Sequence, residues 1–142
     1  MVEMTGRILG IDYGEKRIGL ALSDPLGITA QPLETLHRTR IKEDLNHLKN
    51  LIRDHDVTRI VIGLPLNMNG SEGFMVDSTR AFSKELQEAT SVEIIEIDER
   101  LTSHQAMQAL DTASVKGRKK KKNIDAISAQ IILQTYMNSM PS

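Results

Sequence analysis

The chain has 142 residues, enough for one domain that buries roughly two thirds of its unfolded-chain surface but too few for a second full domain. Its composition, 39% hydrophobic and 26% charged with no cysteine, excludes overall disorder, disulfides, thiolate zinc sites and cysteine nucleophiles. The formal net charge of -1 excludes a global attraction to nucleic acid, so any such binding must come from local charge. We therefore expect residues 1–142 to form a single domain.

The amino terminus and the apolar runs argue against a secreted or membrane protein. Residues 1–7 contain no basic region followed by an apolar core, so they do not resemble a secretory signal. The longest apolar stretches are interrupted well short of the ~20 residues that a membrane helix needs. We expect a cytoplasmic protein with no membrane contact.

The first predicted elements are two strands joined by a polar turn. The apolar run Ile8–Ile11 ends at Asp12 and is typical of a central strand that is covered on both faces. The turn carries Lys16 and Arg17, and a second apolar run follows it. A carboxylate at the end of a central strand, beside basic side chains, suits a metal ion and a phosphate. Taken alone, Asp12 is explained equally well as a residue that caps the turn through its own backbone.

The middle of the chain predicts a third strand, a helix and a fourth strand. Residues 28–36 predict a short strand that Pro32 confines to an edge of the sheet. A helical spacing of apolar residues then predicts an amphipathic helix that begins at Ile41 and contains Leu45, Leu48 and Ile52. Residues 59–64 are mostly β-branched and apolar, so they predict a buried strand, parallel to the first, that Pro65 ends.

The last part of the chain predicts a helix over residues 76–89, a strand over residues 92–97 and two further helices. Thr102 or Ser103 can cap a short helix. The basic run 116–122 repels itself, so we expect a loop that becomes ordered when something anionic binds. The final helix is predicted to begin near Asn123, with Asp125 in its first turn, where a negative charge is favourable in itself.

This order of elements, with carboxylates at three element ends, is that of a ribonuclease H-like fold: a five-stranded mixed sheet with helices on both faces. Four segments resemble the successive motifs of the YqgF family, also called RuvX: Gly10–Gly14, Gly63–Gly70, Asp98–Ser103 and Lys121–Asp125. That family is RuvC-like in fold, and its members are described as candidate Holliday junction resolvases and as nucleases that mature the 5′ end of 16S ribosomal RNA. The resemblance implies that the catalytic positions are Asp12, Glu99 and Asp125.

Carboxylates fit that chemistry because a nuclease must neutralise an anionic phosphodiester and supply a nucleophile together. Two Mg²⁺ or Mn²⁺ ions, about 3.5 to 4 Å apart, can activate water and stabilise the leaving oxygen. Such hard cations take oxygen ligands, which clustered carboxylates supply. Our hypothesis is that Asp12 bridges two metal ions while Glu99 and Asp125 each hold one side.

The chain departs from the RuvC pattern in two places. RuvC enzymes carry their second acidic residue at the end of the fourth strand, where this chain has Gly63-Leu64-Pro65. If Glu99 substitutes from the fifth strand, it must reach across a neighbouring strand, roughly 10 Å from Asp12. RuvC enzymes also carry an acidic residue or a histidine in the last motif, near the place of Lys122. Two-metal chemistry, single-metal chemistry and loss of catalysis all stay open.

The basic residues predict binding to phosphates rather than to bases. Aromatic residues make up only 3% of the chain, which is too few for a stacking platform. The predicted nucleic-acid contacts are Lys16, Arg17, Arg100, Lys116, Arg118, Lys119, Lys120, Lys121 and Lys122. The substrate is either a structured ribosomal RNA precursor or branched DNA, and a homodimer would pair two sites as RuvC-like resolvases do.

Two rival functions come from other classes of protein. A ribosome-assembly factor could keep the fold and the basic run and cut nothing. Residues 12–19 also resemble the first phosphate hairpin of actin-like ATPases and sugar kinases. Those proteins surround the nucleotide with two such domains, whereas this chain has room for one.

Overall fold

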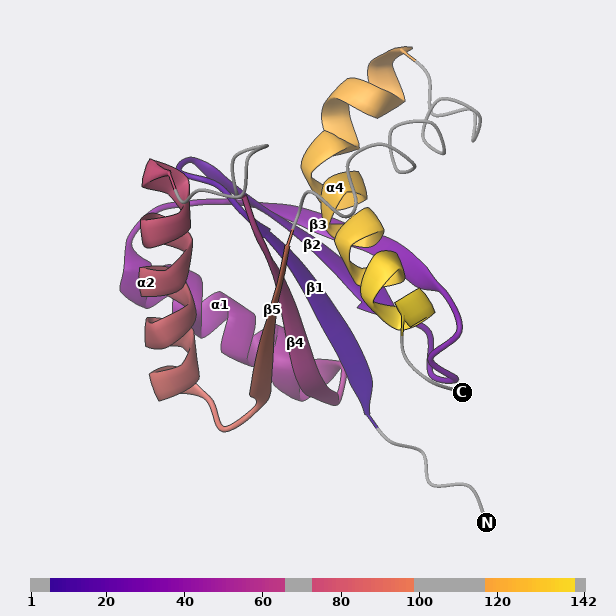
Figure 1. The fold of residues 1–142 in the computed structure, drawn as a ribbon, viewed down its shortest axis with the longest axis horizontal. Helices are drawn as coiled ribbons and strands as arrows, with labels where there is room; N and C mark the ends of the chain where they lie inside the picture. Colours follow the sequence, from indigo (N-terminus) through magenta and orange to yellow (C-terminus); the bar gives the residue numbers. More distant parts are fainter. Residues whose placement is uncertain (1–5, 66–72, 99–116, 140–142) are drawn as a thin grey trace.

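The computed structural model describes residues 6–65, 73–98 and 117–139. Their strands form one mixed sheet in the order β3-β2-β1-β4-β5, with helices on both faces (Figure 1). The strands are β1 Arg7–Tyr13, β2 Arg17–Ser23, β3 Ala30–His37, β4 Val57–Leu64 and β5 Glu93–Asp98. The helices are α1 Ile41–Asp54, α2 Phe74–Ala89 and α4 Gly117–Ser139. This architecture confirms the predicted five-stranded mixed sheet and the predicted order of its elements.

Strand β1 lies at the centre of the sheet, as its apolar sequence predicts. It pairs antiparallel with β2 and parallel with β4. Strand β3 is an edge strand, and its register against β2 shifts between Leu20, which pairs with Glu34, and Ala21, which pairs with Pro32. Proline has no N–H to donate to a ladder, so its place at an edge and beside an irregularity is the expected one.

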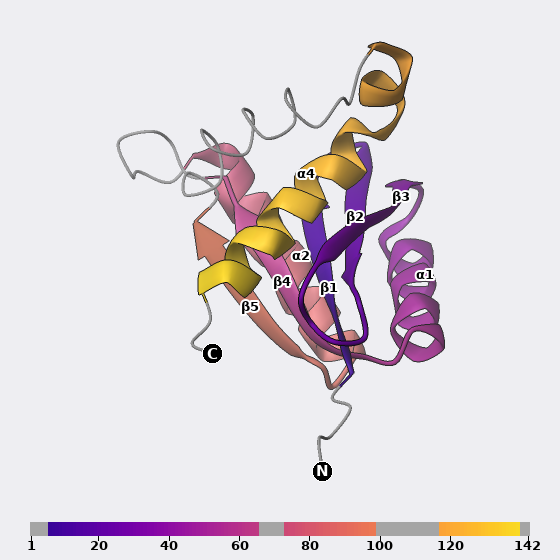
Figure 2. The ribbon, with the colours of Figure 1, turned by 90° about the vertical axis from the view of Figure 1, so that its right-hand side faces the viewer.

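The two faces of the sheet carry two separate cores. Helices α1 and α2 cover one face, and α4 crosses the other diagonally (Figure 2). Leu9 and Ile11 of β1 belong to the core on the α1 and α2 side. Ile8 packs against the core on the α4 side, so strand alternation places Gly10 and Asp12 on that α4 face as well.

Glycines on the α4 face let the helix approach the sheet closely. A Cβ atom at Gly10 would lie 2.8 Å from Cβ of Leu133 and 2.9 Å from the carbonyl oxygen of Ala129. A Cβ atom at Gly19 would overlap the backbone carbonyl of Asp125. Because both positions lack a side chain, α4 lies directly on β1 and β2, which fixes where its residues stand over the sheet.

The beginning of the last helix differs from the prediction. Helix α4 begins at Gly117, not near Asn123, so the basic run 118–122 is helical and not a loop. Lysine and arginine are good helix formers, and a helix spreads successive side chains around its axis, which eases the repulsion between them. Asp125 therefore lies eight residues after the start of the helix, outside the first turn, and the favourable charge of a helix amino terminus does not explain it.

Several predictions lie outside the described residues. They concern the short helix capped by Thr102 or Ser103, the segment after Pro65, and the site residues Glu99, Arg100 and Lys116. In the described parts of the chain, no helix is both long enough and apolar enough to cross a membrane.

Candidate functional site

Asp12 lies near the carboxyl end of the central strand, on the face that α4 covers. It pairs with Gly19 of β2, and Gly19 lies against the backbone of Asp125. Two of the three predicted catalytic residues, Asp12 and Asp125, thus lie beside Gly19 at the end of the sheet where β1 finishes, and we call this end the acidic edge. Asp12 is half-buried, and the side chain of Asp125 is 26% exposed, so water and ligands can reach this edge.

Arg17, predicted to contact nucleic acid, makes an ion pair with Asp125. Its Nε donates to Oδ2 of Asp125 at 2.7 Å. Arg17 stands two residues before Gly19 on β2, so alternation puts it on the same face as Asp12. The sequence places Asp12 and Arg17 close together through the hairpin, but it gave no sign that Asp125, 108 residues further on, is the partner of Arg17.

A second arginine holds the turn between β1 and β2. Arg38 Nη1 donates to the hydroxyl of Tyr13 at 2.7 Å and to the carbonyl oxygens of Gly14 and Glu15 at 3.3 Å each. Its Nε donates to Oδ2 of Asp44, whose side chain is 1% exposed. Arg38 therefore links the turn that precedes Arg17 to the first turn of α1.

Sequence reasoning missed Arg38 because its partners are spread over separate elements. Arg38 follows β3, Asp44 belongs to α1 and Tyr13 ends β1. The ring of Tyr13 also stacks on Phe82 of α2, with ring centroids 4.5 Å apart. The available signal was a charged residue six positions before an aspartate at the start of a helix. Nothing in that spacing distinguishes Arg38 and Asp44 from an ion pair on the surface.

Strand β5 ends beside β4 and not beside β1. Gly63 of β4 pairs with Ile97, and Leu64 pairs with Asp98. Ile97 packs on the α4 side, whereas Glu96 reaches Arg80 of α2, with Nε and Oε1 4.0 Å apart. Alternation therefore assigns Asp98 to the α2 face, away from Asp12. On the α4 face, β4 presents Gly63, which has no side chain.

The basic run lies on the part of α4 that extends past the sheet. Figures 1 and 2 both show the first turns of α4 projecting beyond the edge at which β1 and β4 end. Along the helix axis, Lys122 is about 4.5 Å and Arg118 about 10 Å from Asp125, at 1.5 Å per residue. The basic residues therefore follow one another along the helix, away from Asp125.

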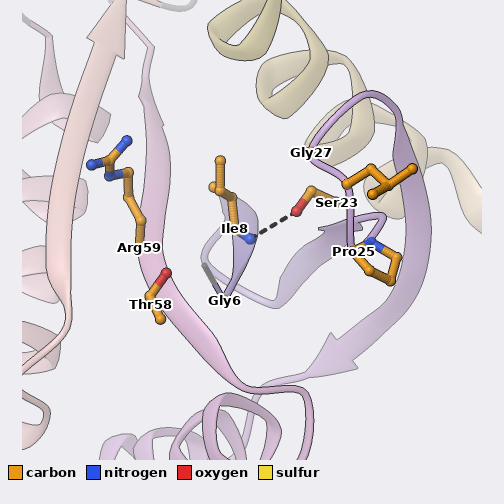
Figure 3. Close-up of a pocket in the computed structure, with 8 residues that line it drawn as sticks. Gly6, Ile8, Ser23, Pro25, Gly27, Thr58 and Arg59 are labelled. Carbon is orange, nitrogen blue, oxygen red and sulfur yellow. Dashed lines mark hydrogen bonds between the residues drawn. The ribbon is translucent and has the colours of Figure 1, made fainter. Parts of the chain in front are cut away.

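A cavity of about 330 Å³ lies at the opposite end of the sheet (Figure 3). It is lined by the starts of β1 and β4, including Ile8 and Arg59, and by the loop 25–27. Ser23 Oγ accepts a hydrogen bond from the backbone N–H of Ile8 at 2.8 Å. The lining contains no carboxylate, so this cavity offers none of the ligands that the acidic edge offers.

The residues at the acidic edge fit a hard divalent cation in part. Asp12 and Asp125 supply carboxylate oxygens, which Mg²⁺ and Mn²⁺ prefer. Within residues 6–65, 73–98 and 117–139, no three histidine, aspartate or glutamate side chains gather into a metal-binding group. The third predicted carboxylate, Glu99, lies outside these ranges.

The chain is similar to one protein family and to individual bacterial proteins over nearly its whole length. A family model described as "RuvX: Holliday junction resolvase" matches residues 6–139. A protein of Carboxydothermus hydrogenoformans is 43% identical over 132 residues, which is 93% of this chain and 96% of that protein. A protein of Clostridium acetobutylicum is 46% identical over 134 residues, which is 94% of this chain and 99% of that protein. Both are named as candidate pre-16S rRNA nucleases.

Two of the solved structures that share the fold of this chain are resolvases. RuvC of T. thermophilus in complex with a Holliday junction substrate has a TM-score of 0.56 at 12% identity, covering 94% of this chain and 95% of RuvC. The fowlpox virus resolvase bound to Holliday junction DNA has a TM-score of 0.59 at 13% identity, covering 96% of this chain and 99% of that one. At this level of identity the likeness shows the ribonuclease H-like fold, which confirms the predicted fold class.

Proposed function

This chain belongs to the RuvX family, whose model matches residues 6–139, and on that premise we propose that it is a metal-dependent nuclease. Its substrate is the precursor of 16S ribosomal RNA, which it trims at the 5′ end in the cytoplasm. The relatives named as candidate pre-16S rRNA nucleases support this choice of substrate. The observation that carries the proposal is that Asp12 and Asp125 flank Gly19 at one edge of the sheet, next to a basic helix.

Asp12, Asp125 and Glu99 are the residues that would hold Mg²⁺ or Mn²⁺. When bound, the metal would supply an activated water and stabilise the charge that develops on the leaving oxygen. Asp12 stands on the central strand β1, which pairs with β2 on one side and with β4 on the other. The basic residues Arg118 to Lys122, on the projecting turns of α4, bind phosphates of the same strand of RNA and orient it toward the carboxylates.

Glu99 is the third ligand of the proposal, although it lies outside the described residues. It follows Asp98, the last residue of β5, directly in the chain. On the α4 face, Gly63 of β4 puts no side chain between the end of β5 and Asp12 on β1. The proposal therefore gives Glu99 the role that RuvC enzymes give to a residue of their fourth strand.

The experiment is a cleavage assay on a 5′-extended 16S precursor fragment with Mn²⁺ or Mg²⁺. Asp12→Asn should abolish cleavage and leave folding and RNA binding intact. Asp54→Asn is the matched control, because it removes an exposed carboxylate at the end of α1, far from the acidic edge, and should cleave as the wild type does. Equal cleavage by wild type and Asp12→Asn would overturn the proposed site. Binding without any cleavage would favour the assembly-factor function instead.

A four-way DNA junction is the second candidate substrate, and the family description favours it. Symmetrical cutting of a junction requires two sites related by a two-fold axis, which a homodimer would provide. The same assay with a junction substrate, together with light scattering to measure the mass in solution, tests this candidate. A monomer that cleaves the RNA fragment and leaves the junction intact would eliminate it.

A further inference from the structure

The ion pair between Arg17 and Asp125 places a positive charge on a proposed metal ligand. Arg17 Nε lies 2.7 Å from Oδ2 of Asp125, so one oxygen of this carboxylate already accepts a charge-assisted hydrogen bond. A divalent cation on the same carboxylate would meet the guanidinium as a like charge. Arg17 and the cation therefore compete for Asp125.

Arg17 is able to leave this position without disturbing the fold. Its side chain is 51% exposed, and it is the first residue of β2, after the turn that Arg38 holds through the carbonyl oxygens of Gly14 and Glu15. Movement is thus confined to the side chain of Arg17. A guanidinium binds phosphate as readily as carboxylate and often with two hydrogen bonds.

We propose that Arg17 is a positioning residue that exchanges Asp125 for a phosphate when nucleic acid binds. Before a cation binds, the guanidinium of Arg17 balances the negative charge of Asp125 and keeps its carboxylate oriented. When a phosphate draws the guanidinium away, Asp125 becomes available to the divalent cation. Nucleic acid then raises the affinity for metal, and metal raises the affinity for nucleic acid by the same factor. This inference rests on the proposed function, since it takes Asp125 as a metal ligand.

Mn²⁺ binding tests the inference apart from any activity. The measurement is titration of the purified chain with Mn²⁺, followed by the electron paramagnetic resonance signal of the unbound ion. Without RNA, Arg17→Gln should bind Mn²⁺ about three- to fivefold more tightly than the wild type, the size expected for a partly exposed ion pair. With a phosphorothioate hairpin RNA present, this difference should shrink, while the same variant binds the RNA more weakly.

Lys16→Gln is the matched control, because it removes a neighbouring exposed positive charge that has no hydrogen bond to Asp125 in the structure. It should raise Mn²⁺ affinity by less than about twofold. Equal Mn²⁺ affinity in Arg17→Gln and wild type, or equal gains in Arg17→Gln and Lys16→Gln, would overturn the exchange and leave the proposed nuclease standing. Absence of Mn²⁺ binding by the wild type, with or without RNA, would overturn the proposed metal site and the exchange together.

Discussion

Gly19 of β2 lies so close to the backbone carbonyl of Asp125 that a Cβ atom could not fit between them. Asp12 pairs with the same glycine from β1. Together with Gly10 of β1, this residue without a side chain therefore decides how near α4 comes to β1 and β2. The distance between the two described carboxylates of the proposed site depends on this close approach.

Gly19→Ala should push the middle of α4 away from the sheet. We expect it to lower the free energy of unfolding by about 1–3 kcal/mol, as overpacking does, and to reduce cleavage strongly at temperatures where the variant is folded. Urea unfolding and the cleavage assay measure the two effects. Gly27→Ala is the control: open space surrounds Gly27, but its φ of +72° should make alanine cost about 1–2 kcal/mol. Cleavage by Gly19→Ala at the wild-type rate would contradict the packing argument. The control Gly27→Ala should cleave at the wild-type rate.

Arg38→Gln should destabilise the protein far more than the loss of an exposed arginine does. It leaves the carboxylate of Asp44, 1% exposed, without its cationic partner, which typically costs about 3 kcal/mol or more. Arg53→Gln breaks an ion pair whose side chains are 70% and 58% exposed, so its cost should stay within about 0.5 kcal/mol. Urea unfolding compares the two variants, and similar costs would show that Arg38 and Asp44 do not act as a buried pair.

Neutralising the basic turns of α4 should weaken RNA binding in a salt-dependent way. For a variant with Gln at positions 119, 120 and 121, we expect the slope of log affinity against log salt to fall by about 2. Fluorescence anisotropy at several salt concentrations measures this slope. The control replaces Lys42 and Lys49, which are exposed on α1 and lie across the sheet from α4. An unchanged slope in the first variant would remove the α4 basic run from the binding surface.

Asp24 should make stability depend on pH in the acid range. The backbone N–H of Thr29, followed by that of Ile28, holds the pKa of Asp24 below its usual 3.8. Because the folded pKa is the lower one, this stabilisation is present above pH 3.8 and is lost as the pH falls through the folded pKa. Asp24→Asn keeps an oxygen that can accept these bonds but cannot titrate. The urea midpoint of the wild type relative to Asp24→Asn should therefore drop as the pH falls below 3.8, and a constant difference would contradict this role.

Local sequence patterns determined most of the fold. The apolar run before Asp12 predicted the central strand, Pro32 predicted the edge strand and Pro65 the end of β4, and each is confirmed. These features depend on backbone chemistry and on burial of neighbouring residues, which a short window of sequence contains. The start of α4 was predicted wrongly, because repulsion within the basic run was given more weight than the helix propensity of lysine and arginine.

Through its resemblance to the RuvX family, the sequence also marked Asp12 and Asp125 as candidate ligands, and the hairpin marked Arg17 as a cation near Asp12. Only the tertiary structure decided that Arg17 bonds to Asp125 and that Gly10 and Gly19 let α4 lie directly on the sheet. It also decided that Arg38 hydrogen-bonds to the turn between β1 and β2. Each of these contacts joins residues that are far apart in the chain. Their geometry follows from how closely a helix can lie on a sheet, which depends on side chains from several elements at once and not on any one stretch of sequence.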